Sequence, residues 1–273
     1  MNFRISLLSL NVLCGTFFNP LPIARHLRQA RLIKQLNPDI ICLQECNNFI
    51  IESVYTKTLA NTHNLIVERR SIKDYVHRVI NILIIATCFS YFCPLIKYVL
   101  LNPYIHNFIF GSQKIGNVIY LKKRFEKRNA RSVAFHSQTG DILNLARQRG
   151  YTEFVLMNQV LVRNTHLNHQ QCLLDPTNES THQQIREVFS DCNQEKMLIV
   201  GDFNVEQVRP SNKFKDIGIH LGPTYRKQNP LASTNDDKRI DYIFAKNVTI
   251  THAQKLTNLE SDHDAIYIYF TLS

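Results

Sequence analysis

The 273-residue chain contains no tryptophan, and its 7 cysteines are an odd number. An odd number cannot form a complete set of disulfides within one chain, and no Cys-x-x-Cys pair or zinc-type Cys/His spacing occurs. Cys42 and Cys46 lie in apolar runs, which is typical of small buried side chains. The cysteines therefore argue against a disulfide scaffold or a zinc finger and favour a reducing compartment.

The chain also lacks internal repeats, low-complexity segments and a Pro/Gly linker, which favours one domain over residues 1–273. The N-terminal run MNFRISLLSLNVLCG is interrupted by Asn11 and is followed by no clear cleavage site. We therefore expect a strand there rather than a secretory signal. The expected location is the cytoplasm or the surface of a membrane, and export by a route without a sequence signal stays open.

Hydrophobic residues make up 44% of the chain and charged residues 20%, as in globular proteins. The formal net charge of +10 suits an anionic partner. A nucleic acid, a phospholipid surface and a phosphorylated substrate all meet that description, and charge alone does not choose among them. We expect a monomer.

Hydrophobic periodicity predicts many strands and a few helices. Together they favour an α/β layered fold, with packed sheets inside and helices outside. The hairpin expected within 154–167 turns about Met157 to Gln159. The predicted helices are 22–36, 46–60 and 181–192, and the predicted strands are 3–13, 39–45, 62–69, 117–121, 154–167, 197–203, 239–245 and 264–272.

The most apolar part of the chain is residues 79–110, within an insertion at about 71–113. Its cleanest window, Ile82 to Ile96, includes Pro94 and is shorter than the roughly 20 residues of a spanning helix. A basic band at 114–131 follows directly. An apolar segment beside cations suits a peripheral membrane contact, although core packing beneath a solvated face explains the pattern equally well.

Polar residues follow the apolar strand that ends at Gly201. Asp202 and Asn204 are expected on the same side, because side chains alternate along a strand. Taken singly, such an Asp is usually a turn residue or a helix cap. Five further apolar strands carry a carboxylate, amide or imidazole at or near one end, at Asn11, Glu45, His166, Asp241 and Asp262-His263.

Such repetition predicts one shared cleft rather than scattered surface polarity. Its oxygen-rich donors favour Mg²⁺, with Mn²⁺ or Ca²⁺ as alternatives, over zinc. Carboxylates, a divalent cation and histidine donors suit displacement at phosphorus.

The set SLNV, LQE, NTHL, GDFN, RIDYIF and SDHD, in this order, resembles the endonuclease/exonuclease/phosphatase superfamily. The resemblance runs from end to end of the chain. It implies the DNase I-like fold, a four-layer α/β sandwich with two mixed sheets face to face. It also implies a metal-dependent phosphoric ester hydrolase.

On the metal side, the resemblance implies Glu45 as the main Mg²⁺ ligand, with Mn²⁺ as the alternative ion. Asn11 would lie beside the metal and the phosphate, and Asp262 would support the metal site. Asn11 and Asp241 also have a simpler interpretation as strand-end caps.

On the phosphate side, the resemblance implies that Asp202 positions or activates the attacking water and that Asn204 holds Asp202, the water or a phosphoryl oxygen. His166 and His263 would donate hydrogen bonds to the phosphate. Asp241 would orient His263 and raise its basicity, as a carboxylate does for a neighbouring imidazole.

The substrate is less determined, because selectivity depends on loops and insertions. The pair Arg149-Gly150 before the hairpin resembles the neutral sphingomyelinase branch, and the apolar insertion suits a membrane. We therefore expect a phosphodiesterase acting on a phospholipid headgroup. A nonspecific nuclease on DNA or RNA is the first alternative, and a catalytically silent phosphoester-binding module is the second.

Overall fold

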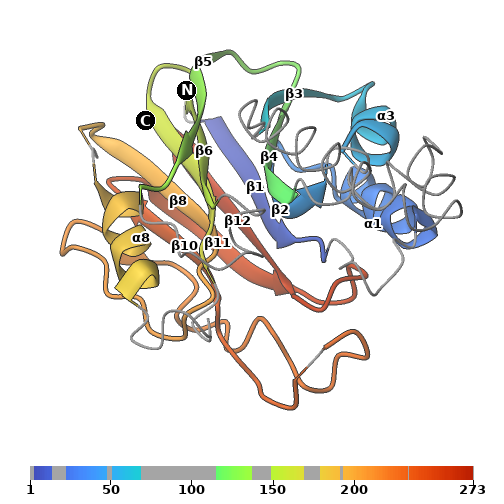
Figure 1. Ribbon diagram of the computed structural model, residues 1–273. Helices are drawn as coiled ribbons and strands as arrows, with labels where there is room; N and C mark the ends of the chain where they lie inside the picture. Colours follow the sequence, from blue (N-terminus) through green and yellow to red (C-terminus); the bar gives the residue numbers. More distant parts are fainter. Residues whose placement is uncertain are drawn as a thin grey trace, which may run out of the picture.

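The computed structural model describes residues 3–13, 23–47, 51–68, 115–136, 149–168, 179–190, 193–232 and 234–272. Two six-stranded mixed sheets face each other within these residues, which confirms the predicted α/β sandwich (Figure 1). The apolar insertion predicted at 71–113 lies outside the described residues.

Sheet A has the strand order β11–β12–β1–β2–β4–β3. The first strand, β1, pairs in parallel with β2 and antiparallel with β12, so the two ends of the chain meet in the middle of this sheet. The strands of sheet A are β1 (Phe3–Asn11), β2 (Ile40–Asn47), β3 (His63–Glu68), β4 (Ile115–Lys122), β11 (Thr249–Leu256) and β12 (Ala265–Leu272).

Sheet B has the order β5–β6–β7–β8–β10–β9. The predicted hairpin joins β6 to β7 through Met157 to Gln159, and β7 runs parallel to β8. The strands of sheet B are β5 (Lys127–Ala134), β6 (Gly150–Leu156), β7 (Val160–His166), β8 (Lys196–Asp202), β9 (Lys215–Asp216) and β10 (Asp241–Lys246).

Helices cover the outer face of each sheet (Figure 1). The helix α1 (Ile23–Leu36), the π-helix η1 (Ile51–Thr56) and the short α3 (Lys57–Leu59) pack on sheet A, where they share one apolar cluster with it. The helix α8 (Glu179–Phe189) covers sheet B. These four layers are the architecture that the resemblance implied.

Alternation along the strands divides their side chains between the two faces of each sheet. In β7, Val160 and Val162 face the core between the sheets, whereas Leu161 faces the layer of α8. In β8, Leu198 and Val200 face the same inter-sheet core. The next inward position on β8 is therefore Asp202, and the same parity places polar side chains at one end of the inter-sheet space.

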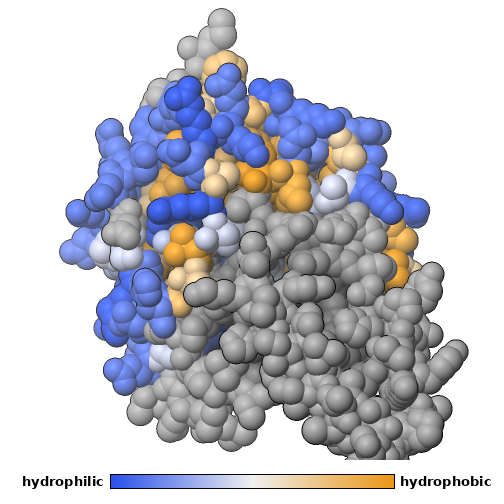
Figure 2. Space-filling view, turned by 45° about the horizontal axis from the view of Figure 1, so that its top comes forward, coloured by the Kyte–Doolittle hydropathy of each residue, from blue (hydrophilic) through white to orange (hydrophobic). Residues whose placement is uncertain are grey.

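We call this the catalytic end, where β1, β2, β7 and β8 finish and β10 begins. The opposite far end carries both described termini and the turn between β4 and β5 (Figure 1). The far end comes forward in Figure 2, where its described residues are mostly hydrophilic.

Three predictions about elements differ from the structure. Residues 46–60 were predicted as one helix, but β2 continues to Asn47 and a π-helix follows at 51–56. The strands β5 and β11 were not predicted, because their sequences lack an apolar run; β5 is almost wholly exposed and β11 is mostly half-buried. Each is an edge strand of its sheet, and pairing with β12 or β6 defines it.

The described part of the chain contains no helix that is long and apolar enough to cross a membrane. The basic band is described from Ile115 onward, and its cations from Lys122 to Arg128 lie at the far end. Its cations lie in the β4–β5 turn and along β5.

Candidate active site

Inward-facing positions on four strands bring the predicted polar residues together. Asn11 ends β1, His166 ends β7, Asp202 ends β8 and Asp241 begins β10. All four side chains are buried, with at most 4% of their surface exposed. Residues that lie far apart in sequence therefore share one small volume between the two sheets.

Asp202 lies at the centre of this group. Its Oδ2 accepts a hydrogen bond from Asn11 Nδ2 at 2.9 Å and lies 3.4 Å from His166 Nε2. Its Oδ1 accepts a hydrogen bond from the backbone N–H of Asn204 at 2.8 Å. One carboxylate oxygen is thus held by β1 of the facing sheet, and the other by the backbone that directly follows β8.

Asn204 is placed differently from the sequence expectation. The strand β8 ends at Asp202, and Asn204 has φ of 53°, so strand alternation no longer applies. Its side chain donates to the carbonyl of Leu167 at 2.9 Å. Asn204 therefore holds Asp202 through its backbone, while its amide side chain fixes the loop after β7.

The pKa of Asp202 is raised to about 7. Burial is the main cause, and the nearby charge of Asp241 adds to it, while His263 acts in the opposite direction. A carboxylate with such a pKa is poised to accept a proton near neutral pH.

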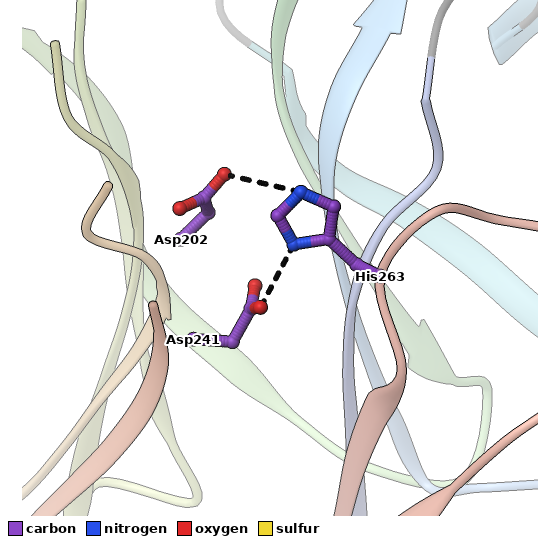
Figure 3. A group of neighbouring side chains, drawn as sticks. All are labelled: Asp202, Asp241 and His263. Carbon is purple, nitrogen blue, oxygen red and sulfur yellow. Dashed lines mark hydrogen bonds and ion pairs between the residues drawn. The ribbon is translucent and has the colours of Figure 1, made fainter. Parts of the chain in front are cut away.

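His263 and Asp241 form a hydrogen-bonded pair, in which Nδ1–H of the imidazole donates to Asp241 Oδ2 at 2.8 Å (Figure 3). The other imidazole nitrogen, Nε2, points toward Asp202 and lies 3.9 Å from its Oδ2. Burial alone would lower the pKa of His263, but Asp241, Asp202 and Asp262 outweigh it and raise that pKa well above its usual value. His263 is therefore held as a cation that has one N–H directed into the site.

His166 is fixed by a residue to which the sequence assigned no role. Arg149 is buried and donates through Nη1 to His166 Nδ1. Because Nδ1 accepts, the proton of a neutral His166 resides on Nε2, which faces Asp202 and Glu45. The Arg149-Gly150 pair was visible in the sequence, but its contact with His166 depends on the β6–β7 pairing.

Glu45 reaches the site through an irregularity in β2. The register between β2 and β4 shifts between Leu43 and Cys46, and Glu45 has φ of 56°. Leu43 and Cys46 both face the helix side of sheet A, so Glu45 is the extra residue of a β-bulge. The bulge directs its carboxylate toward sheet B, where Oε1 lies 3.7 Å from His166 Nε2.

Asp262 lies close to Glu45 and accepts a hydrogen bond from Ser261 Oγ at 3.3 Å. The pKa of Asp262 is raised, chiefly by burial, and the negative charge of Glu45 adds to the effect. Two carboxylates that repel each other in this way fit a divalent cation, which would neutralise both. The donor set thus supports the predicted placement of a metal at Glu45 and Asp262.

A second group could also hold a metal. One ligand atom each from Asp202, Asp241 and His263 lie within 4.8 Å of one another, the only such group of three found among the described residues. However, Nδ1 of His263 is already bonded to Asp241, and all three side chains are buried. The Glu45 side chain keeps 23% of its surface exposed, which leaves room for the water ligands that Mg²⁺ retains, so we favour the Glu45–Asp262 position.

Gly201 is required by the backbone beside Asp202. Its φ is 139°, and a Cβ added there would lie 2.0 Å from the carbonyl oxygen of Thr165 on β7. Only glycine allows β8 to approach β7 this closely, which brings Asp202 next to His166.

Comparison with known proteins gives a family for this arrangement. A model described as "Endonuclease/Exonuclease/phosphatase family" matches residues 8–263, a range that contains every predicted site residue. No curated protein sequence matches the chain.

Solved structures share the fold at low sequence identity. Truncated Caenorhabditis elegans TDP2 has a TM-score of 0.63 at 16% identity, with 99% of this chain and 98% of that chain covered. D. rerio TDP2 complexed with single strand DNA product has a TM-score of 0.65 at 16% identity, with 98% of both chains covered. An endonuclease/exonuclease/phosphatase from Beutenbergia cavernae has a TM-score of 0.63 at 15% identity, covering 99% of this chain and 72% of that one.

Proposed function

Because the chain belongs to the endonuclease/exonuclease/phosphatase family, whose members are metal-dependent phosphoric ester hydrolases, we propose that it hydrolyses a phosphodiester by attack of water. The observation that carries this proposal is the convergence on Asp202. Its Oδ2 accepts a hydrogen bond from Asn11 Nδ2 and faces the Nε2–H groups of both His166 and His263. A general base between two phosphate-binding donors is the arrangement that displacement at phosphorus needs.

Each group then has a defined part in the reaction. Asp202 accepts the proton of the attacking water, since its raised pKa lies near neutrality. His263 donates through Nε2–H to a phosphoryl oxygen, because Asp241 holds Nδ1. His166 donates through its own Nε2–H, which Arg149 fixes as the protonated nitrogen.

A divalent cation bound by Glu45 and Asp262 would supply positive charge for the phosphoryl oxygens. The oxygen ligands favour Mg²⁺, with Mn²⁺ as the alternative. Asn11 lies next to this position, but its Oδ1 accepts the backbone N–H of Leu13 at 3.0 Å and its Nδ2 donates to Asp202. We assign Asn11 to orienting Asp202 rather than to binding the metal.

A phospholipid headgroup is the substrate that we put first. The apolar insertion connects β3 to β4, and the described residues nearest to it, Glu68 and Ile115, lie toward the catalytic end. In register, Glu68 pairs with Val118 and Ile115 pairs with Asn47, two residues beyond Glu45. The described residues that flank the insertion therefore lie toward the catalytic end, where an apolar segment would help a lipid substrate.

The basic band does not support the same contact. Lys127 pairs with Leu156 at the far end, whereas Ala134 pairs with Gly150, which in turn pairs with His166. The strand β5 thus spans the length of the sandwich, and its most basic part lies away from the site. A bilayer held by Lys122 to Arg128 would face the end opposite to the catalytic residues, so the peripheral membrane contact we propose excludes this part of the band.

A nucleic acid is the second candidate substrate. The D. rerio TDP2 structure holds a single strand DNA product on the same fold, and a net charge of +10 suits a polyanion. Binding governed by charge would weaken steeply as salt rises, which a headgroup reaction on neutral lipid would not do.

The test is hydrolysis in Mg²⁺ and in EDTA, with sphingomyelin vesicles, phosphoinositide vesicles, plasmid DNA and RNA as substrates. We expect metal-dependent turnover of one of these, with about 10³-fold loss in Glu45→Ala. Turnover that persists in EDTA would contradict the proposed mechanism. Metal binding without turnover of any of these phosphodiesters would favour the silent binding module.

We also propose that the protein acts as a monomer in the cytoplasm or at the surface of a membrane. Sedimentation of the purified chain with and without vesicles tests both parts of this proposal.

A further inference from the structure

Beneath the catalytic residues lies a layer of neutral polar side chains that the mechanism does not use. We call it the amide layer, and its members face inward from both sheets. They are Ser9, Gln44, Asn117 and Asn164.

Asn164 connects the two sheets in this layer. It lies on β7 and is completely buried. Its Nδ2 donates to the carbonyl of Leu43 at 2.9 Å and to that of Val118 at 3.1 Å, both in sheet A. Its Oδ1 accepts from Gln44 Nε2 at 2.7 Å. One side chain of sheet B therefore binds three groups of sheet A.

These partners lie at the β-bulge that presents Glu45. Leu43 and Val118 face each other in the last regular pair of the β2–β4 ladder before the register shifts. Gln44 directly precedes Glu45 and is anchored further by donating to Ser9 Oγ at 3.2 Å. The amide layer thus fixes the residues on the N-terminal side of Glu45.

Such support is needed, because a positive φ strains the backbone of a non-glycine residue such as Glu45. Without the bulge, Glu45 would follow the parity of Ile41 and Leu43 and face the helix layer. A neutral amide can hold the bulge without adding a charge beneath the buried carboxylates.

We infer that Asn164 and Gln44 are positioning residues, which hold the β2 bulge and thereby direct Glu45 toward the metal position. This inference rests on the proposed function, since it assigns a purpose to the geometry of that site. Asn164 acts through Glu45 and touches neither the metal nor the phosphate.

The test is direct Mn²⁺ binding to the full chain, measured by titration calorimetry and independent of turnover. We expect Asn164→Leu and Gln44→Met to weaken Mn²⁺ affinity by about tenfold or more. The matched control is Ser6→Ala, which removes a buried hydrogen bond to Asp39 at the far end of the same sheet. It should lower the melting temperature and leave Mn²⁺ affinity unchanged.

A double-mutant cycle tests whether Asn164 affects Mn²⁺ affinity through Glu45. In a Glu45→Gln background, Asn164→Leu should cause no further loss of Mn²⁺ affinity, because the carboxylate that it positions is gone. If Asn164→Leu does not fold, Gln44→Met replaces it in the same cycle, with the same expected effect on Mn²⁺ affinity. Variants that lose thermal stability yet bind Mn²⁺ as the wild type does would overturn the inference alone. A wild-type chain that binds no Mn²⁺ would overturn the proposed metal site and this inference together.

Discussion

Two buried aspartates at opposite ends of the sandwich have opposite electrostatic environments. Asp39 at the far end accepts hydrogen bonds from the backbone and the hydroxyl of Ser6, both at 2.9 Å, and pairs with Lys122 and Arg124. Asp202 at the catalytic end has no Lys or Arg partner among the described residues and instead lies near Asp241.

Their pKa values differ accordingly. Burial acts to raise the pKa of Asp39, but the hydrogen bonds from Ser6 and Lys122 outweigh it and lower the value below its usual range. Burial raises the pKa of Asp202 to about 7. The far end therefore stabilises its carboxylate, whereas the catalytic end keeps one that a proton or a cation must neutralise.

The largest effect should come from Asp202→Asn, which removes the proposed base while keeping the shape of the side chain. We expect activity to fall by about 10³-fold. The melting temperature of the cation-free protein should not fall, because the change removes a buried charge. Steady-state kinetics and thermal unfolding test this prediction. Retention of more than a tenth of wild-type activity would exclude Asp202 as the base.

The matching change at the far end, Asp39→Asn, should act on stability alone. Loss of the paired carboxylate leaves Lys122 without its buried partner, and we expect a loss of about 2 kcal/mol in the free energy of unfolding. Turnover per folded molecule should stay at the wild-type value. A metal-dependent activity defect in this variant would show that the two ends are coupled.

The pH dependence of stability tests the electrostatic environment of Asp202 directly. The folded-state pKa of Asp202, about 7, lies above its unfolded value, so the folded state binds more protons between those values. The stabilisation is present at acid pH and is lost as pH rises toward 7. In EDTA, the difference in melting temperature between Asp202→Asn and wild type should grow by roughly 5 °C from pH 4.5 to 6.5. A constant difference would contradict the raised pKa.

The smallest effect should come from Arg124→Ala. The Arg124 side chain is 63% exposed, and Lys122 still neutralises Asp39 at 3.0 Å. We expect a loss of about 0.5 kcal/mol in stability, which diminishes with added salt. Urea unfolding at low and high salt measures it, and a loss comparable with that of Asp39→Asn would assign the stabilisation to Arg124 instead of Lys122.

Much of the fold was predictable, because the apolar strands carry their own pattern. The hairpin at Met157 to Gln159 and the strands that lead to His166 and Asp202 were all found from the sequence. The edge strands β5 and β11 were missed, because their existence depends on hydrogen bonds to β6 and β12. A polar segment at an edge has no periodicity that distinguishes it from a loop.

The sequence indicated which residues gather at the candidate site better than it indicated the contacts between them. The predicted residues lie near one another at the catalytic end, but the Asn204 side chain bonds to the carbonyl of Leu167, and the roles of all of them stay predictions. The contact of Arg149 with His166 was missed, and Asn204 was expected to continue an alternation that ends at Asp202.

By itself, the sequence determined which polar residues end the apolar strands, because strand alternation needs only the order of residues along the chain. The tertiary structure decided which way Glu45 points, since a bulge exists only relative to the partner strand β4. It also placed the cations from Lys122 to Arg128 at the end opposite to the catalytic residues, although the same strand, β5, continues to Ala134, which pairs with Gly150. Strand direction and register within a sheet set that separation, and both arise from pairing between distant segments.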